Sequence, residues 1–194
     1  WKSLELINEE FLRGTKTFCL LHSKEINHAV GSTQNKRILK STDKANFVIA
    51  NSNYTKELAI KIGINPSKIH VIFPGIKKPE IIENSFKIEA KKIFDKSFPK
   101  IITVARLEKR KGHDKILMLI KNLKNKFNKI KYISIGFGEE ENNLVKLSKE
   151  LSIENEVVFL KNINENLKLA LISESNLFLM PSRIEKKSVE GFGI

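Results

Sequence analysis

The 194-residue sequence has almost none of the features that covalent cross-linking or membrane insertion requires. Its single cysteine, Cys19, lies in a short apolar run, which excludes a disulfide framework and fits a reducing compartment. No apolar run approaches the ~20 residues of a membrane-spanning helix, and no secretory signal is visible. Because the chain begins with Trp1 instead of methionine, we expect its natural start to be missing.

Several common catalytic and metal-binding patterns are also absent. The sequence contains no CxxC, HExxH or P-loop pattern and no Ser-His-Asp order. Three of its histidines, His28, His70 and His113, have no shared spacing that suggests a metal site. The helix-rich signatures of DNA-binding domains are missing too. The sequence therefore supports neither a metal site nor sequence-specific DNA binding.

Positive charge is what the sequence has in excess. Its 35 Lys and Arg residues outnumber 22 Asp and Glu residues, for a net charge of +13. Such a surface attracts nucleic acids, anionic lipid headgroups or phosphorylated small molecules. The lysines are scattered along the expected helices, so a general role in solubility stays open as well.

Hydrophobic periodicity in the first part of the chain predicts alternating helices and strands. We expect helices at 3–13, 34–44 and 54–62, the first with Leu4, Ile7 and Phe11 on one apolar stripe. We expect strands at 17–21, which reads as buried, 47–50 and 69–73. This alternation favours a parallel sheet with helices on its faces. The segment 75–97 is charged, has little periodicity before a helix near 87–94, and is expected to link two domains.

The second part repeats the alternation. We expect strands at 101–105, 132–135, 157–160 and 177–180, the last one buried. We expect helices at 113–127, 139–151 and 164–174, and the first of them carries an apolar stripe of Ile116, Ile120, Leu123 and Phe127. The predicted fold class is therefore α/β with two Rossmann-like parallel-sheet domains, both incomplete in this chain. The expected domains are 1–74 and 98–194, joined by the linker 75–97.

One candidate ligand site follows the strand at 101–105. Arg106 comes directly after this strand, and Lys111 and Gly112 come just before the next helix. The carboxyl ends of parallel strands are where such sheets bind ligands. A guanidinium, an ammonium and a helix N-terminus together suit a diphosphate. A solvated basic loop is the alternative that the spacing alone leaves open.

Two other strand ends carry candidate residues. His22 follows the strand at 17–21 and can hydrogen-bond a substrate hydroxyl or transfer a proton, unless it is structural. Glu190 lies in the loop after the last strand and can accept hydrogen bonds from sugar hydroxyls, unless it is an ordinary surface residue. The turn 136–138 reads Gly-Phe-Gly and lacks the third glycine of the dinucleotide fingerprint, so it predicts a tight turn, not an NAD site.

Taken in order, these segments resemble retaining, nucleotide-sugar-dependent glycosyltransferases of GT-B fold (family four, the group 1 type). Segment 104–112 resembles the family's G-R-L-x-x-x-K-G motif, with Ala105 in place of the glycine. Segment 22–26 resembles its H-G-x-E-V segment, and 136–138 its G-x-G turn. Segment 190–194 resembles the first half of its E-x7-E motif, after a basic insertion that some relatives carry.

The resemblance implies a two-domain enzyme with its active site in the cleft between the domains. Arg106 and Lys111 would hold the donor diphosphate and stabilise the leaving nucleoside diphosphate, with no metal or other cofactor. Glu190 would bind the transferred sugar, and His22 would contact the sugar or acceptor near the anomeric carbon. The implied catalytic residues are His22, Arg106, Lys111 and Glu190, and the implied donor-binding residues are Arg106, Lys111, Gly136, Gly138, Glu190, Gly191, Phe192, Gly193 and Ile194.

The implied reaction moves a hexose from a nucleotide-diphosphate sugar to a glycan or lipid-linked acceptor, in surface polysaccharide or lipopolysaccharide synthesis. The expected location is the cytoplasm, with a peripheral contact to anionic membrane and no nucleic acid partner. A sugar-nucleotide epimerase of the same fold and a non-enzymatic, basic polyanion-binding module are the alternatives. The second glutamate of E-x7-E and the family's first βα unit are missing, so we expect a fragment lacking both ends, which can be inactive by itself.

Overall fold

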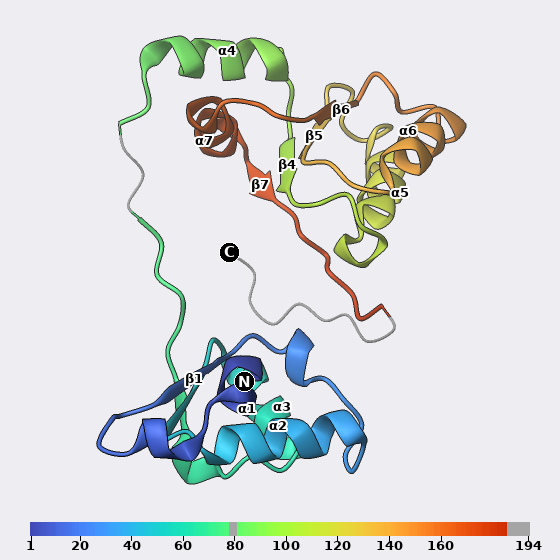
Figure 1. The fold of residues 1–194 in the computed structure, drawn as a ribbon. Coiled ribbons are helices and arrows are strands. Elements are labelled where there is room, and N and C mark those ends of the chain that lie inside the picture. Colours follow the sequence, from blue (N-terminus) through green and yellow to red (C-terminus); the bar gives the residue numbers. More distant parts are fainter. Residues whose placement is uncertain (78–80, 186–194) are drawn as a thin grey trace. The chain divides into compact units, whose positions relative to one another are not determined.

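The computed structural model describes residues 1–77 and 81–185. The chain folds into two compact units. Unit 1 runs from Trp1 to Ile76 and also takes in Ile184 and Glu185, and unit 2 runs from Lys77 to Arg183. Each unit is built on its own parallel sheet (Figure 1), which confirms the expected α/β class with two parallel sheets. No helix in the two described ranges is long and apolar enough to cross a bilayer.

Unit 1 holds a three-stranded sheet with the strand order β1-β2-β3. The strands are β1 (Phe18–Leu21), β2 (Phe47–Ala50) and β3 (Ile69–Val71), and the helices are α1 (Lys2–Leu6), α2 (Thr33–Asp43) and α3 (Asn53–Lys61). Short 3-10 turns lie at η1 (Glu9–Leu12), η2 (Lys24–Ile26) and η3 (Pro66–Lys68). Serine side chains start the two long helices: Ser32 accepts from the N–H of Asn35, and Ser52 from that of Thr55.

The expected helix at 3–13 is wrong in its length. α1 ends at Leu6, and the chain starts a separate turn where the Asn8 side chain accepts from the N–H of Glu10. Phe11, which the helical stripe placed on the buried face, is 80% exposed. An Asn side chain offers the backbone an alternative partner, and this competes with continuing the helix.

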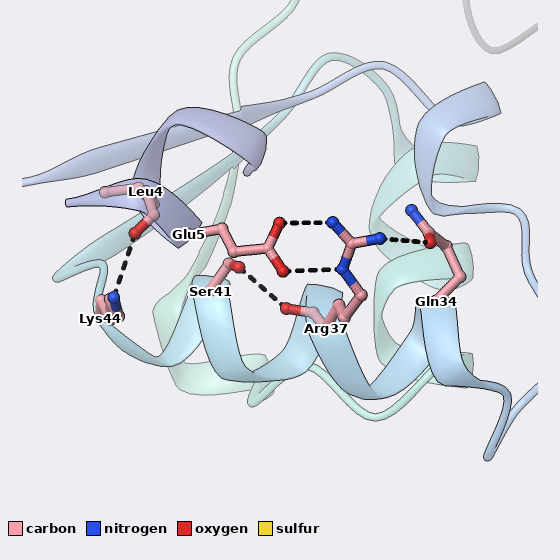
Figure 2. Close-up of polar contacts among 6 residues, drawn as sticks. All are labelled: Leu4, Glu5, Gln34, Arg37, Ser41 and Lys44. Atoms are coloured by element: carbon pink, nitrogen blue, oxygen red, sulfur yellow. Dashed lines mark hydrogen bonds and ion pairs between the residues drawn. The ribbon is translucent and has the colours of Figure 1, made fainter.

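α1 is tied to α2 by a polar cluster that Figure 2 shows. The two carboxylate oxygens of Glu5 accept from Nε and Nη2 of Arg37 at 2.7 and 2.8 Å. Nζ of Lys44 donates to the carbonyl oxygens of Leu4 and Ile7 at 3.2 and 2.9 Å. These contacts dock a very short helix that intrinsic propensity alone would not hold.

The expectation that the strand at 17–21 is buried is wrong for one of its faces. Cys19 and Leu21 are in the core, but Phe18 is 61% and Leu20 54% exposed. Phe18 stacks on Phe47 of β2, with ring centroids 5.1 Å apart. Successive strand residues face opposite sides of a sheet, and the core of unit 1 covers one side of this strand.

Unit 2 holds a four-stranded parallel sheet with the strand order β6-β5-β4-β7. The strands are β4 (Lys100–Val104), β5 (Lys131–Ile135), β6 (Val157–Leu160) and β7 (Leu177–Phe178). The helices are α4 (Asn84–Phe94), α5 (His113–Leu123), α6 (Glu141–Glu150) and α7 (Glu165–Glu174), and the 3-10 turn η4 (Lys109–Lys111) precedes α5. α5 and α6 lie on one face of the sheet and α4 and α7 on the other (Figure 1).

Alternate strand residues fill the two layers of unit 2. Ile101 and Tyr132 pack with α5 and α6, while Ile102 and Ile133 pack with α4 and α7. The predicted stripe on the helix after Gly112 is confirmed, since its residues Ile116 and Ile120 are buried and Leu123 and Phe127 pack against the same core.

The expected buried strand at 177–180 is shorter and more exposed than predicted. β7 spans two residues and pairs with β4 alone, and Leu177 and Phe178 are 47% and 44% exposed. β7 is the last strand of the described sheet, so one of its sides has no neighbouring strand. β4, β5 and β6 follow one another in one direction across the sheet, whereas β7 lies on the other side of β4, so the strand order reverses between β4 and β7. In open α/β sheets, ligands bind at the carboxyl end of such a switch point.

Candidate functional site

Two loops leave the sheet of unit 2 at the switch point. The β4 loop comprises residues 105–112 and the β7 loop, as far as it belongs to unit 2, residues 179–183. Hydrogen bonds join them and their strands: the N–H of Leu179 donates to Ile102 O at 2.9 Å, and that of Arg183 to Arg110 O at 2.8 Å. The two loops therefore form one continuous rim along the carboxyl edge of the sheet.

Arg106, the first predicted cation, stands on this rim with an exposed side chain. Its Nη1 lies 2.7 Å from Glu108 Oε1, and its side chain is 64% exposed. The other oxygen of Glu108 accepts from Nε of Arg110 at 2.9 Å. Glu108 thus holds two guanidinium groups side by side, and an incoming anion would compete with it for Arg106.

Lys111, the second predicted cation, is buried at the base of the same loop. The residue is only 8% exposed, and Nζ lies 3.9 Å from the sulfur of Met180 in the β7 loop. A buried ammonium has few accessible rotamers, so its charge stays at a fixed place. The structure therefore brings both predicted cations onto one loop, one exposed and one fixed.

Arg183 links the β7 loop to α5 through an ion pair that the sequence does not predict. Its Nη1 lies 3.0 Å from both carboxylate oxygens of Asp114, in the first turn of α5. In the sequence, Arg183 is only the first residue of the basic insertion before Glu190. The ion pair fixes the β7 loop to the helix that begins right after Lys111.

Glycines let the loops approach one another. A Cβ on Gly136 would collide with the carbonyl oxygen of Ala105, and one on Gly138 with the backbone of Leu107. The N–H of Leu107 also donates to Phe137 O at 3.0 Å. Close packing on the β4 loop accounts for the glycines at 136 and 138, and their contact with a donor stays a prediction.

His113 forms a buried polar group directly behind the β4 loop. It is 2% exposed, and burial lowers the pKa of its imidazole. Nε2 lies 3.3 Å from Arg106 O, and Nδ1 lies 3.1 Å from the Tyr132 hydroxyl and 3.2 Å from Ser134 Oγ. Burial also raises the pKa of Tyr132 to about 12. The sequence did not predict this hydrogen-bonded group, because Tyr132 and Ser134 lie on β5, far from His113 along the chain.

His22 lies in unit 1, at the carboxyl end of β1, with an exposed side chain. Its backbone N–H donates to the carboxylate of Glu25, which shapes the turn after the strand. Ser23 follows with a positive φ of 77°, and its Oγ lies 2.5 Å from Thr55 Oγ1. The role of His22 toward a sugar or acceptor stays a prediction.

The remaining predicted donor-binding residues, Glu190, Gly191, Phe192, Gly193 and Ile194, lie outside the described residues. Among the described residues, no group of three or more His, Cys, Asp or Glu side chains could hold a metal ion. The proposed independence from metal stays a prediction.

A parallel sheet with helices on both faces and a strand order that reverses beside β4 places unit 2 in the class of Rossmann-like domains. The sequence model of the family described as "Glycosyl transferases group 1" matches residues 84–194, more than half of the chain. The chain therefore belongs to the group 1 glycosyltransferases, which confirms the resemblance of its motifs.

Curated relatives support the same family. The O-antigen biosynthesis glycosyltransferase WclY of Escherichia coli is 32% identical over 130 residues, 66% of this chain and 33% of that protein. The uncharacterized glycosyltransferase MJ1069 of Methanocaldococcus jannaschii is 30% identical over 142 residues, 72% of this chain and 35% of that protein. The chain thus spans about a third of the length of the curated relatives it matches.

A solved structure shares the fold. The crystal structure of Anabaena Alr3699/HepE in complex with UDP superposes with a TM-score of 0.73 at 18% identity, over 89% of this chain and 48% of that one. HepE has also been solved in complex with UDP-glucose, with a TM-score of 0.69 at 19% identity. At this level of identity the likeness shows the fold alone.

Proposed function

We propose that this protein is a retaining glycosyltransferase. It moves a hexose from a nucleotide-diphosphate sugar to a glycan or lipid-linked acceptor, in the synthesis of surface polysaccharide or lipopolysaccharide. The observation that carries the proposal is the pair Arg106 and Lys111 on one loop at the switch point of unit 2. The names of WclY, an O-antigen biosynthesis glycosyltransferase, and of the UDP-glucose complex of HepE support the acceptor and donor classes.

The proposed role of the rim is to bind and stabilise a diphosphate. The exposed guanidinium of Arg106 can take two oxygens of the donor, and the fixed ammonium of Lys111 adds a point charge beside them. Negative charge grows on the nucleoside diphosphate as the glycosidic bond breaks, and cations already in place lower the energy of that state. The proposal assigns this task to side chains and needs no metal or other cofactor.

Residues beyond the rim complete the proposal. Glu190 would accept hydrogen bonds from the hydroxyls of the transferred sugar, aided by the backbone N–H groups of Phe192, Gly193 and Ile194. His22 would contact the sugar or acceptor near the anomeric carbon, where configuration is retained. These assignments come from the matched motifs of the family.

The first experiment measures sugar transfer from UDP- and GDP-sugars by the intact protein and two variants. Arg106→Ala removes an exposed side chain, and Lys111→Met removes a charge but keeps the buried stem. Each should lower kcat/KM by about 30-fold or more, which corresponds to about 2 kcal/mol of lost charge stabilisation.

Lys109→Ala is the matched control, because it removes one positive charge from an exposed position on the same loop. We expect its kcat/KM to stay within about twofold, as for most exposed charges. Arg106→Ala and Lys111→Met variants that transfer sugar as fast as the Lys109→Ala variant would refute the diphosphate assignment. Conversion of the donor sugar without an acceptor would instead indicate the epimerase alternative.

We also propose a cytoplasmic location with peripheral contact to the inner face of the membrane. The net charge of +13 favours an anionic surface. A groove of about 440 Å³ in unit 2 is lined by the exposed Ile88, by two acids, Asp95 and Glu174, and by four lysines, Lys91, Lys92, Lys96 and Lys100. Lys100 pairs with Glu174, and the four lysines still outnumber the two acids. Basic side chains around an apolar one suit anionic lipid headgroups.

A further inference from the structure

We propose that His113 is a positioning residue: it holds the main chain of Arg106 so that the guanidinium meets the donor diphosphate. This inference rests on the proposed function for its last step. His113 itself is buried and lies behind the β4 loop, so it would act through Arg106 without touching substrate.

The partners of His113 fix which nitrogen carries the proton. Nε2 lies 3.3 Å from Arg106 O, and a carbonyl oxygen only accepts, so Nε2 is the donor. Nδ1 then accepts from the Tyr132 hydroxyl at 3.1 Å or from Ser134 Oγ at 3.2 Å. A neutral imidazole with one donor and one acceptor satisfies this arrangement, and burial, which lowers the pKa of His113, favours the neutral form.

The main chain around Arg106 is held from two directions. On one side, the N–H of Ala105 donates to Ile135 O and that of Leu107 to Phe137 O, both at 3.0 Å. On the other side, the carbonyl oxygen of Arg106 accepts from the N–H of Glu108 at 2.8 Å and from Nε2 of His113 at 3.3 Å, so His113 adds a contact from outside the loop to one within it. The Arg106 side chain is largely exposed, so the main chain decides where it begins. Ordering the loop before the anion arrives lowers the entropic cost of binding.

Two variants separate the hydrogen bond from the bulk of the side chain. The amide nitrogen of His113→Gln reaches about as far as imidazole Nε2 and can still donate to Arg106 O. The shorter His113→Asn ends near the position of Nδ1 and cannot reach that oxygen. Both variants are neutral and polar, and both lose the ring, so a loss of stability alone should affect them alike.

Backbone hydrogen exchange in residues 105–108 of the intact protein tests the positioning without any ligand. We expect exchange to accelerate about three- to tenfold in His113→Asn, the effect of losing one neutral hydrogen bond, and much less in His113→Gln. Titration with UDP, or GDP if the wild type prefers it, tests the consequence. The dissociation constant should rise about three- to tenfold in His113→Asn and stay within about twofold in His113→Gln.

The outcomes are distinct. Equal exchange rates in the two variants would overturn the positioning role, whatever the protein binds. Different exchange rates with unchanged nucleotide affinity would overturn the link from the main chain to the anion site. A wild type that binds no nucleoside diphosphate would refute the proposed function, and the exchange rates would still decide whether His113 holds the loop.

Discussion

Ser23 shows at the residue scale how a tight turn positions a candidate functional group. It has φ 77° and ψ −61°, and the N–H of Lys24 donates to His22 O at 3.0 Å across it. This is a γ-turn of the rare, strained kind, in a region that favours glycine. The compensation is a buried hydrogen bond from Ser23 to Thr55. The turn sets the direction in which the chain leaves His22.

The turn makes a prediction about two small substitutions. Ser23→Ala loses the hydroxyl and keeps the strained Cβ, whereas Ser23→Gly loses the hydroxyl and the strain together. We expect the glycine variant to have the larger free energy of unfolding of the two, by about 1 kcal/mol. Urea unfolding followed by the fluorescence of Trp1, the single tryptophan, measures this in unit 1. The opposite order would mean that the turn carries no strain.

Residues of the site differ in how far the sequence could reveal them. Arg106 and Lys111 could be predicted, because their type, their spacing and the strand before them are all local. His113 could not, because its role depends on Tyr132 and Ser134, which only the pairing of β4 with β5 brings near. The pairing of Glu108 with Arg106 was also missed, since a charged loop gives no sign of which ions meet.

At the element scale, the order of helices and strands was predictable and their burial was not. Periodicity and capping residues mark where an element begins, as Ser52 does for α3. Whether a strand is covered depends on its neighbours in space. β1 and β7 were expected to be buried from their apolar residues, yet both have exposed apolar side chains in the described structure.

The docking of α1 on α2 depends on an ion pair and hence on pH. The hydrogen bond from Arg37 lowers the pKa of Glu5 below its ordinary value when the helix is docked. Docking is therefore fully supported above the ordinary pKa, about 4.3, and this support is lost as the pH falls through the lower, docked pKa. Trp1 caps α1, and its ring lies 5.8 Å from the Arg37 guanidinium carbon, so its fluorescence reports docking.

We predict an acid transition in Trp1 fluorescence that begins below about pH 4.3 and that the Glu5→Gln variant lacks. The variant should show at neutral pH the spectrum that the wild type reaches only in acid. Glu9→Gln is the control, since Glu9 is an exposed acid on the neighbouring turn. Circular dichroism checks that the unit stays folded. A transition of the same midpoint in Glu5→Gln would show that another group controls docking.

At the scale of the whole molecule, the excess of positive charge has a local and a general interpretation. A charge of +13 spread over the surface would attract any anionic membrane without a preferred orientation. The groove with Lys91 and Lys92 offers a specific contact instead, on the exposed side of α4. The two interpretations predict different losses of membrane binding when the same amount of charge is removed at different places on the surface.

Co-sedimentation with vesicles at physiological salt separates them. Reversal of Lys91 and Lys92 to Glu removes charge at the groove, and reversal of Lys36 and Lys40 removes the same charge from the exposed side of α2. If the groove makes the contact, the first pair should weaken partitioning onto anionic vesicles by about tenfold or more, from about 1 kcal/mol per basic residue at the surface.

The second pair should then have a much smaller effect, and vesicles of zwitterionic lipid should bind none of the proteins. Raising the salt should weaken wild-type binding, because exposed charges are screened over about 10 Å at 0.1 M. Equal losses in both pairs would indicate a general electrostatic attraction and exclude the groove as the contact. No wild-type binding to anionic vesicles would exclude the membrane contact altogether, and the lysines would then serve solubility.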